Sequence, residues 1–253
     1  MQVKIKSDSF RKYIQGIQAV FNGGVTFVVY PNRIECLTVS ADKSSVVFCG
    51  VVSCETEGIT EPVTLHLRDI AKLNTLLGFN QGNEYFEFTI EDSFIFYKND
   101  DIRGAKFMLN ERPFRREETL LKRNWFKIND EIFSAKVFTE DIKKSIQATA
   151  FASDSDKVYL YLEDGAFVAE LNDETIANID SVKMNYSNFF NGSFSGKYII
   201  KVDSLRCIPL PMGGQVLFQM IEKTSDVLSG KTLYCTVSDE GCLFRYLLNQ
   251  WRD

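Results

Sequence analysis

Histidine is almost missing from this 253-residue sequence, which contains only His66. The six cysteines include no CxxC pair, and most of them lie inside apolar runs such as VVFCGVV. A structural zinc site needs clustered Cys and His ligands, and a Ser-His-Asp triad needs a positioned histidine. The sequence therefore predicts no metal site and disfavours most hydrolases. Its cysteines are typical of reduced, buried side chains in an intracellular protein.

Long apolar runs and phosphate-binding motifs are also missing. No stretch approaches the ~20 consecutive apolar residues of a membrane-spanning helix, and no apolar signal core follows MQVKIKSDSF. Neither GxxxxGK[ST] nor GxSxG occurs, and Gly23-Gly24 and Gly213-Gly214 precede strand-like runs, where turns are the commoner explanation. We therefore expect a protein that is not an enzyme, binds no cofactor and contacts no membrane.

Charge excludes one further class. The 29 basic and 34 acidic residues give a net charge of -5, which argues against a protein that coats nucleic acid over its whole surface. A local basic face is still compatible with this net charge.

The 45% hydrophobic content, with 21 Phe, is enough to form hydrophobic cores, and the length has room for two domains.

Short alternating strands dominate the pattern. They are expected at 25–30, 33–39, 45–52, 84–90, 93–97, 157–162, 166–171, 197–202, 216–221 and 232–237. Helical spacing is limited to 9–21, 68–79, 139–151 and 203–208. The sequence thus predicts an α+β fold with few helices.

The chain also contains an internal repeat. A shift of 132 residues aligns the first helix with the third, strand 26–30 with 158–162, and strand 34–37 with 166–169. The stretch 111–131 between the repeats is charged and shows little alternation, as is usual for a connector. We expect a first domain at 1–110, a connector at 111–131 and a second domain at 132–253.

The expected helices have one apolar and one cationic face. Helix 9–21 places Phe10, Tyr13, Ile14 and Ile17 inward, and helix 139–151 places Ile142, Ile146 and Thr149 inward. Acidic residues at the helix starts, Asp8, Glu140 and Asp141, can cap the helices or complement their dipoles. The outward cations and amides suit contact with phosphates, which carry no sequence information, although they could be ordinary solvated faces. These candidate DNA-binding residues are Arg11, Lys12, Gln15, Arg68, Lys72, Lys143, Lys144, Gln147 and Arg206.

Two segments then carry a resemblance to a known family. The run LHLRDIAKLNTLLGFNQGNEYFEFTIED (65–92) looks like the second helix and following hairpin of ring-shaped DNA sliding clamps of the proliferating cell nuclear antigen type and their phage counterparts. The final GCLFRYLLNQ (241–250) resembles that family's last strand and tail in Gly241, Leu243, Tyr246 and Leu247. With the repeat, the resemblance covers nearly the whole chain.

The resemblance implies two repeated clamp domains, each with helices packed on antiparallel sheet, and a closed homotrimeric ring whose helices line the hole. It implies a processivity factor that encircles double-stranded DNA without sequence preference and tethers the replicative DNA polymerase, with a clamp loader and client proteins as further partners. Such a protein acts inside cells at sites of DNA replication, in a host cell if it is viral or phage. The alternative is a clamp-like polymerase accessory protein that stays monomeric or dimeric.

The family also implies contact surfaces. Subunits would pair the strand near 103–109 with the strand near 176–186 of a neighbour. Large apolar residues in the connector and tail suggest a pocket for client peptides, and the resemblance adds Val46 and Phe48; the alternative is that these residues pack the connector onto the second domain. The expected pocket residues are Val46, Phe48, Leu120, Leu121, Trp125, Tyr246, Leu247 and Leu248.

Overall fold

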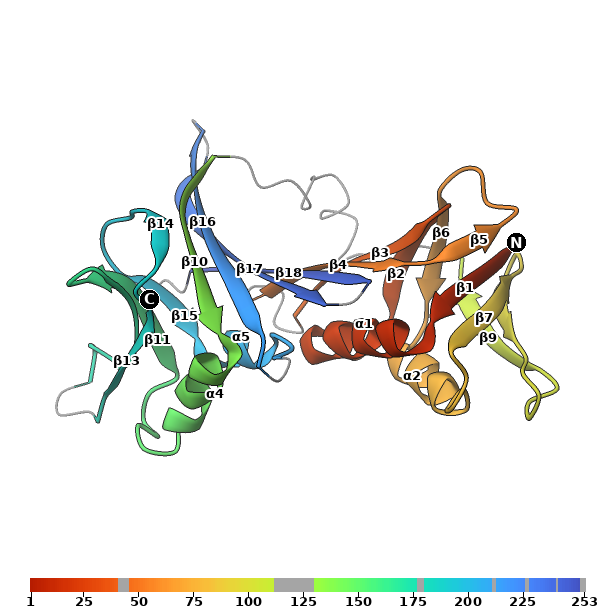
Figure 1. Ribbon diagram of the computed structural model, residues 1–253, viewed down its shortest axis with the longest axis horizontal. Coiled ribbons are helices and arrows are strands. Elements are labelled where there is room, and N and C mark those ends of the chain that lie inside the picture. The colour runs from red at the N-terminus through yellow and green to blue at the C-terminus, as the bar shows by residue number, and fades with distance from the viewer. Residues whose placement is uncertain are drawn as a thin grey trace. The chain divides into compact units, whose positions relative to one another are not determined.

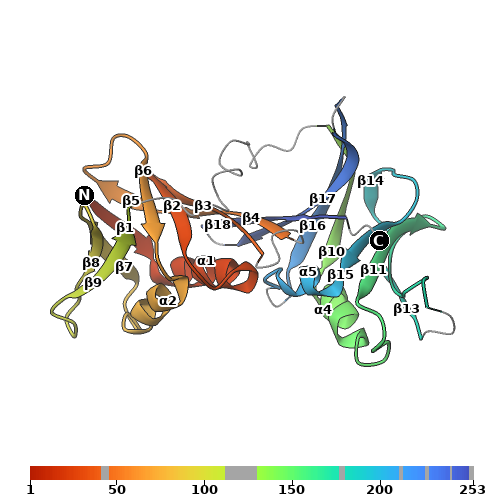
Figure 2. The same cartoon turned by 180° about the vertical axis from the view of Figure 1, so that it is seen from behind.

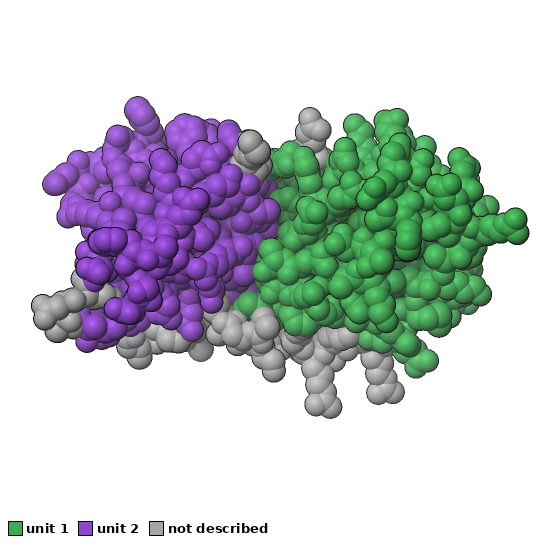
Figure 3. Space-filling model, turned by 90° about the horizontal axis from the view of Figure 1, so that it is seen from below, with its two compact units in different colours: residues 1–43, 47–125, 238–244 green, residues 44–46, 126–237, 245–253 purple. Residues whose placement is uncertain are grey.

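A computed structural model (Figure 1) describes residues 1–40, 46–111, 130–176, 180–210, 213–225, 228–239 and 241–250, with the side chains of 223–225 and 228–229 left out. The regular elements among these residues are helices and antiparallel strands, so the predicted α+β class is confirmed. The chain divides into two compact units, coloured in Figure 3. Unit 1 comprises residues 1–43, 47–125 and 238–244, and unit 2 comprises 44–46, 126–237 and 245–253.

Unit 1 is built mainly from the first half of the chain. Its elements are β1 (Gln2–Lys6), α1 (Ser7–Val20), β2 (Val25–Tyr30), β3 (Arg33–Val39), β4 (Val46–Ser53, whose first residue belongs to unit 2), β5 (Glu55–Glu57), β6 (Val63–Leu67), α2 (Ile70–Gly78), β7 (Tyr85–Ile90), β8 (Phe94–Tyr97) and β9 (Ala105–Asn110). The strands lie in the order β4-β3-β2-β6-β9-β8-β7-β1-β5 and pair antiparallel. The two helices lie next to each other on this unit (Figures 1 and 2).

The apolar face of α1 forms the centre of the unit 1 core. Phe10, Tyr13, Ile14 and Ile17 are buried, as their spacing predicts. The Tyr13 hydroxyl donates to the Gly50 carbonyl oxygen at 3.2 Å, so the buried phenol keeps a partner. The outward face of α1 is thereby fixed relative to the strands.

Residues from the end of the chain complete unit 1, which the expected contiguous domains did not include. Lys12 pairs with Asp239, the Cys242 thiol donates to the Ser9 carbonyl oxygen at 3.2 Å, and the Phe244 ring stacks 6.3 Å from that of Tyr13. These contacts tie residues 238–244 to α1. Unit 1 is therefore discontinuous in sequence.

Unit 2 repeats the combination of helices and antiparallel strands. Its elements are β10 (Glu131–Phe138), α4 (Thr139–Ala148), β11 (Lys157–Glu163), β12 (Ala166–Leu171), β13 (Val182–Ser187), β14 (Phe190–Gly192), β15 (Tyr198–Lys201), α5 (Val202–Arg206), β16 (Gln215–Ser225), β17 (Leu228–Asp239) and β18 (Cys242–Leu248), with the end of β17 and the start of β18 in unit 1. One sheet has the order β14-β10-β16-β17-β18, and a second has the order β13-β12-β11-β15.

The inner face of α4 differs from its prediction. Ile142 is buried as expected, but Ile146 and Thr149 are only half-buried, and Ser145 is buried in their place. The Ser145 hydroxyl lies 2.7 Å from the hydroxyl of Tyr186 on β13, a hydrogen bond that draws this side of the helix onto the sheet. The buried face of α4 thus includes a polar contact, which apolar spacing alone does not predict.

Candidate nucleic-acid interface and strand edges

The outward face of α1 carries two cations that both have acidic partners. The Arg11 guanidinium lies 3.7 Å from the Asp8 carboxylate, three residues earlier. The Lys12 ammonium lies 2.8 Å from Asp239, a residue far away in sequence. Gln15 is exposed one turn further along the helix. The predicted α1 residues thus share one face, but their charge is partly neutralised.

In α2 the acidic residue has a different use. Asp69 is the N-cap, and its carboxylate accepts hydrogen bonds from the backbone N–H groups of Ala71 at 2.9 Å and Lys72 at 3.3 Å. The exposed side chain of Arg68 donates through Nε to the Leu109 carbonyl oxygen at 3.2 Å. Neither Arg68 nor Lys72 forms an ion pair within the part of the chain that the structure describes.

Both lysines of α4 are paired within the helix. Lys143 lies 3.4 Å from Glu140, and Lys144 lies 2.8 Å from Asp141. The hydrogen bond that Lys144 donates to the Asp141 carboxylate raises the pKa of Lys144. The pKa of Glu140 is lowered, first by the hydrogen bond from the Gly213 N–H and then by Lys143, so this carboxylate stays ionised. Gln147 is exposed beyond them.

The short helix α5 repeats this arrangement. Arg206 Nη1 lies 2.7 Å from Asp203, and its Nη2 donates to the Thr149 hydroxyl at 3.4 Å. Because Thr149 follows α4 directly, the Arg206 bond joins the two helices. Unit 2 therefore brings Lys143, Lys144 and Arg206 onto neighbouring helices.

These ion pairs were not predicted, because the acidic residues at the helix starts were expected to cap the helices or to complement their dipoles. The N-cap residues of α1, α4 and α5 are Lys6, Phe138 and Lys201, and none of them forms a side-chain capping bond. Asp8, Glu140 and Asp141 lie one residue or more inside their helices and contact cations instead. The acid-x-x-base spacing could have identified these pairs.

The strand β9 leaves part of one side open. Residues 105–108 pair with β8, whereas β6 pairs only with Leu109 and Asn110, and no other described strand covers the remaining stretch. The Leu109 N–H donates to the Ser93 carbonyl oxygen on the β8 side. Since backbone N–H groups alternate along an antiparallel strand, those of Lys106 and Met108 point to the open side.

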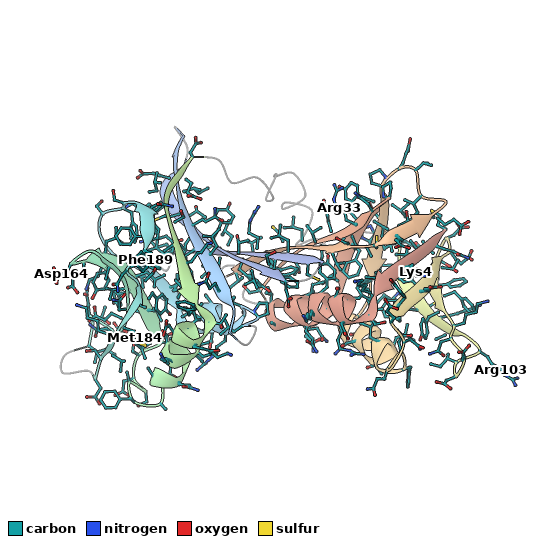
Figure 4. All side chains as sticks on the ribbon, viewed as in Figure 1. Lys4, Arg33, Arg103, Asp164, Met184 and Phe189 are labelled. Atoms are coloured by element: carbon teal, nitrogen blue, oxygen red, sulfur yellow. The ribbon has the colours of Figure 1, made fainter. Side chains whose placement is uncertain are left out.

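Exposed apolar side chains lie near this opening. Met108 is 45% exposed and Phe79, at the end of α2, is 56% exposed. Asn99, in the loop between β8 and β9, donates to the Phe79 carbonyl oxygen at 3.1 Å and so holds this loop next to α2. Arg103 projects from the same loop (Figure 4). An unpaired edge beside apolar groups is a surface suited to association.

Unit 2 has a comparable edge at β13. This strand pairs only with β12 among the described strands, so its other side is open. Met184 lies on β13 (Figure 4), and its sulfur accepts a hydrogen bond from Ser145 of α4. Ile176, shortly before the strand, and Phe151, shortly after α4, are 45% and 64% exposed.

Five of the residues expected to form a peptide pocket are buried in the structure: Val46, Phe48, Tyr246, Leu247 and Leu248. Their strands β4 and β18 turn these side chains into the cores. Leu120, Leu121 and Trp125 lie outside the described residues. A peptide pocket remains a prediction.

The described residues contain no group of three or more His, Cys, Asp or Glu side chains arranged to hold a metal ion. Among their helices, none combines the length and the apolar character needed to cross a membrane.

Comparison with known proteins identifies the fold of the chain. No family model and no curated protein matches the sequence. Among solved structures, the chain is similar to PCNA of A. fulgidus bound to the C-terminal region of FEN-1, with 15% identity, a TM-score of 0.73, and 100% of this chain and 98% of that chain covered. PCNA of Entamoeba histolytica matches with 8% identity and a TM-score of 0.73 over 99% and 98% of the two chains.

A chain of the PCNA2-PCNA3 complex from Sulfolobus tokodaii is similar at 10% identity and a TM-score of 0.70, with 99% of each chain covered. These identities are low, but the matches run from end to end. The chain therefore has the fold of the PCNA-type sliding clamps.

Proposed function

We propose that this protein is a DNA sliding clamp, a processivity factor that closes into a homotrimeric ring around duplex DNA. The observation that carries the proposal is the pair of open strand edges, β9 in unit 1 and β13 in unit 2, on a clamp fold. Two different edges on one chain allow head-to-tail association, and a head-to-tail contact closes into a ring when its rotation permits. The exposed side chain of Met108 on β9 supports burial in a subunit contact.

The helix faces supply the DNA contact in this proposal. Each unit presents exposed or half-exposed cations and amides on neighbouring helices. Attraction to phosphates holds a duplex without fixing its register, so a ring can slide along it. The DNA-contacting residues are Arg11, Lys12, Gln15, Arg68, Lys72, Lys143, Lys144, Gln147 and Arg206.

The partners follow from this role. The ring tethers a DNA polymerase to its template inside the cell, is opened on DNA by a clamp loader, and performs no catalysis itself. Client proteins dock through short peptides with apolar anchors. The A. fulgidus PCNA structure with the C-terminal region of FEN-1 supports this mode for a protein of the same fold. The long, charged connector 111–131 supports a viral or phage source.

The second candidate is a clamp-like accessory protein that remains monomeric or dimeric. The net charge of -5 favours it, because like-charged chains repel one another. Its DNA contact would use the same helix faces, but it would not be held on the duplex by topology.

Light scattering of the full chain and a Met108→Pro variant tests the ring. Proline removes one of the two N–H groups that point to the open side of β9, and it leaves the donors toward β8 intact. We expect the wild type at three times the 28.9 kDa chain mass and Met108→Pro at one. Met108→Ala is the matched control, since it loses the exposed side chain but keeps the N–H.

Other outcomes separate the candidates. A wild type that stays monomeric at the highest attainable concentration contradicts the ring. A wild-type dimer favours the open accessory protein, and a trimeric Met108→Pro chain would show that β9 is not the contact.

A further inference from the structure

The four described helices α1, α2, α4 and α5 share a spacing that the DNA-binding role does not require. An acidic residue near each helix start is followed three residues later by a cation: Asp8 by Arg11, Asp69 by Lys72, Glu140 by Lys143, Asp141 by Lys144, and Asp203 by Arg206. Every one of these cations belongs to the proposed DNA-contacting set. The acidic residues therefore stand where DNA phosphates would approach.

In α1, α4 and α5 the acidic residues form ion pairs with these cations. The closest pairs are Lys144 with Asp141 at 2.8 Å and Arg206 with Asp203 at 2.7 Å. The Asp203 side chain is 78% exposed and that of Asp8 is 91% exposed, so these carboxylates lie at the surface that a duplex would meet. The charges are also balanced in number: α4 carries two acidic and two basic residues, and α5 carries one of each.

A phosphate that approaches such a pair meets a cation whose charge is already compensated. It must either displace the carboxylate or accept repulsion from it, and both weaken the contact. The release of counterions, which drives non-specific binding, also falls when a cation is neutralised by its own protein. Exposed ion pairs add little to folding stability, so stability alone gives a weak reason for the recurrence of this pattern.

We propose that Asp8, Glu140, Asp141 and Asp203 act as affinity-limiting residues: they hold the helix cations in ion pairs and keep the contact with duplex DNA weak enough for rapid sliding. This inference rests on the proposed DNA-clamp function. Topology holds a closed ring on DNA, so weak helix contacts cost it no persistence. Asp69 is excluded from the set, because its carboxylate caps the backbone of α2.

The test compares two full-length variants of equal charge in a salt titration of binding to a linear duplex. The first carries Asp8→Asn, Glu140→Gln, Asp141→Asn and Asp203→Asn. The second neutralises four ion-paired carboxylates away from the helices, with Glu35→Gln, Glu87→Gln, Glu163→Gln and Glu174→Gln. Both variants raise the net charge by four, so a general charge effect is matched between them. Thermal unfolding and light scattering are recorded for each.

We expect the helix variant to bind the duplex on the order of tenfold more tightly than wild type, with a steeper dependence of log K on log salt. The control variant should gain much less. Replacing Arg11, Lys143, Lys144 and Arg206 with Gln in the helix variant should remove the gain.

Three results would overturn the proposal: equal gains in the two variants, no gain in the helix variant, or a gain that survives loss of the four cations. A lower melting temperature with unchanged DNA affinity would assign the acidic residues to helix stability alone. Failure of the clamp function itself appears separately, as a wild-type chain that stays monomeric in light scattering.

Discussion

The helices α2 of unit 1 and α4 of unit 2 use the same acid-x-x-base spacing in different ways. In α2 the acidic residue stands at the N-cap, where Asp69 binds backbone N–H groups and leaves Lys72 without an ion pair among the described residues. In α4 the acidic residues stand inside the first turn, and Asp141 binds Lys144 directly. A shift of the carboxylate by two or three positions relative to the N-cap thus decides whether a helix presents a free or a compensated cation.

This comparison predicts its largest effect on DNA binding. Replacing Arg68 and Lys72 by Ala should lower the slope of log K against log salt by about one unit for each lost phosphate contact. Replacing Lys143 and Lys144 by Ala should lower it less, because these lysines are already paired with Glu140 and Asp141. Fluorescence anisotropy of a labelled duplex over a salt series measures both slopes. Equal losses in the two double variants would show that ion pairing does not limit contact.

A smaller effect should appear in folding stability. Asp69→Ala removes the cap of α2 and should cost about 1 kcal/mol, since capping residues typically contribute that much. Asp141→Ala removes a surface ion pair and should cost clearly less. Urea unfolding of both variants checks the order. If Asp141→Ala is the more destabilising, the division between capping and pairing is wrong.

The smallest effect concerns the pH dependence of folding stability, and it comes from His66 of unit 1. Burial lowers the pKa of His66 below 6.5, and its Nδ1 lies 2.9 Å from the Thr26 hydroxyl. The folded state therefore prefers the neutral ring, and stability should fall as the pH drops through 6.5, where the unfolded chain gains its proton first. Melting temperatures of wild type and His66→Gln between pH 5 and 8 check this. Parallel curves for the two chains would contradict it.

The helices were largely predictable from sequence, because each has a clear apolar stripe. The expected segments 9–21 and 139–151 correspond to α1 (Ser7–Val20) and α4 (Thr139–Ala148), with ends that differ by up to three residues. The strands β1 and β10 were not predicted. Each runs directly into a helix at Lys6 or Phe138 without an intervening turn residue, so no Gly or Pro marks the boundary.

The site was predictable only in part. The helix cations were identified correctly as exposed or half-exposed residues, because charge on the polar face of an amphipathic helix is a local property. The pair between Lys12 and Asp239 joins residues from opposite ends of the sequence, and no local pattern encodes it. Burial of Tyr246 and Leu247 likewise depends on the long-range packing of β18.

Retention on a linear duplex with blocked ends tests the central claim, that the protein encircles DNA, most directly. The protein is mixed with a linear duplex, bulky blocks are attached to both ends, and the complex is washed at high salt, which removes contacts that depend only on phosphate attraction. We predict that the protein stays on the blocked duplex and is lost from an identical duplex with free ends. Equal loss from both duplexes would contradict encirclement.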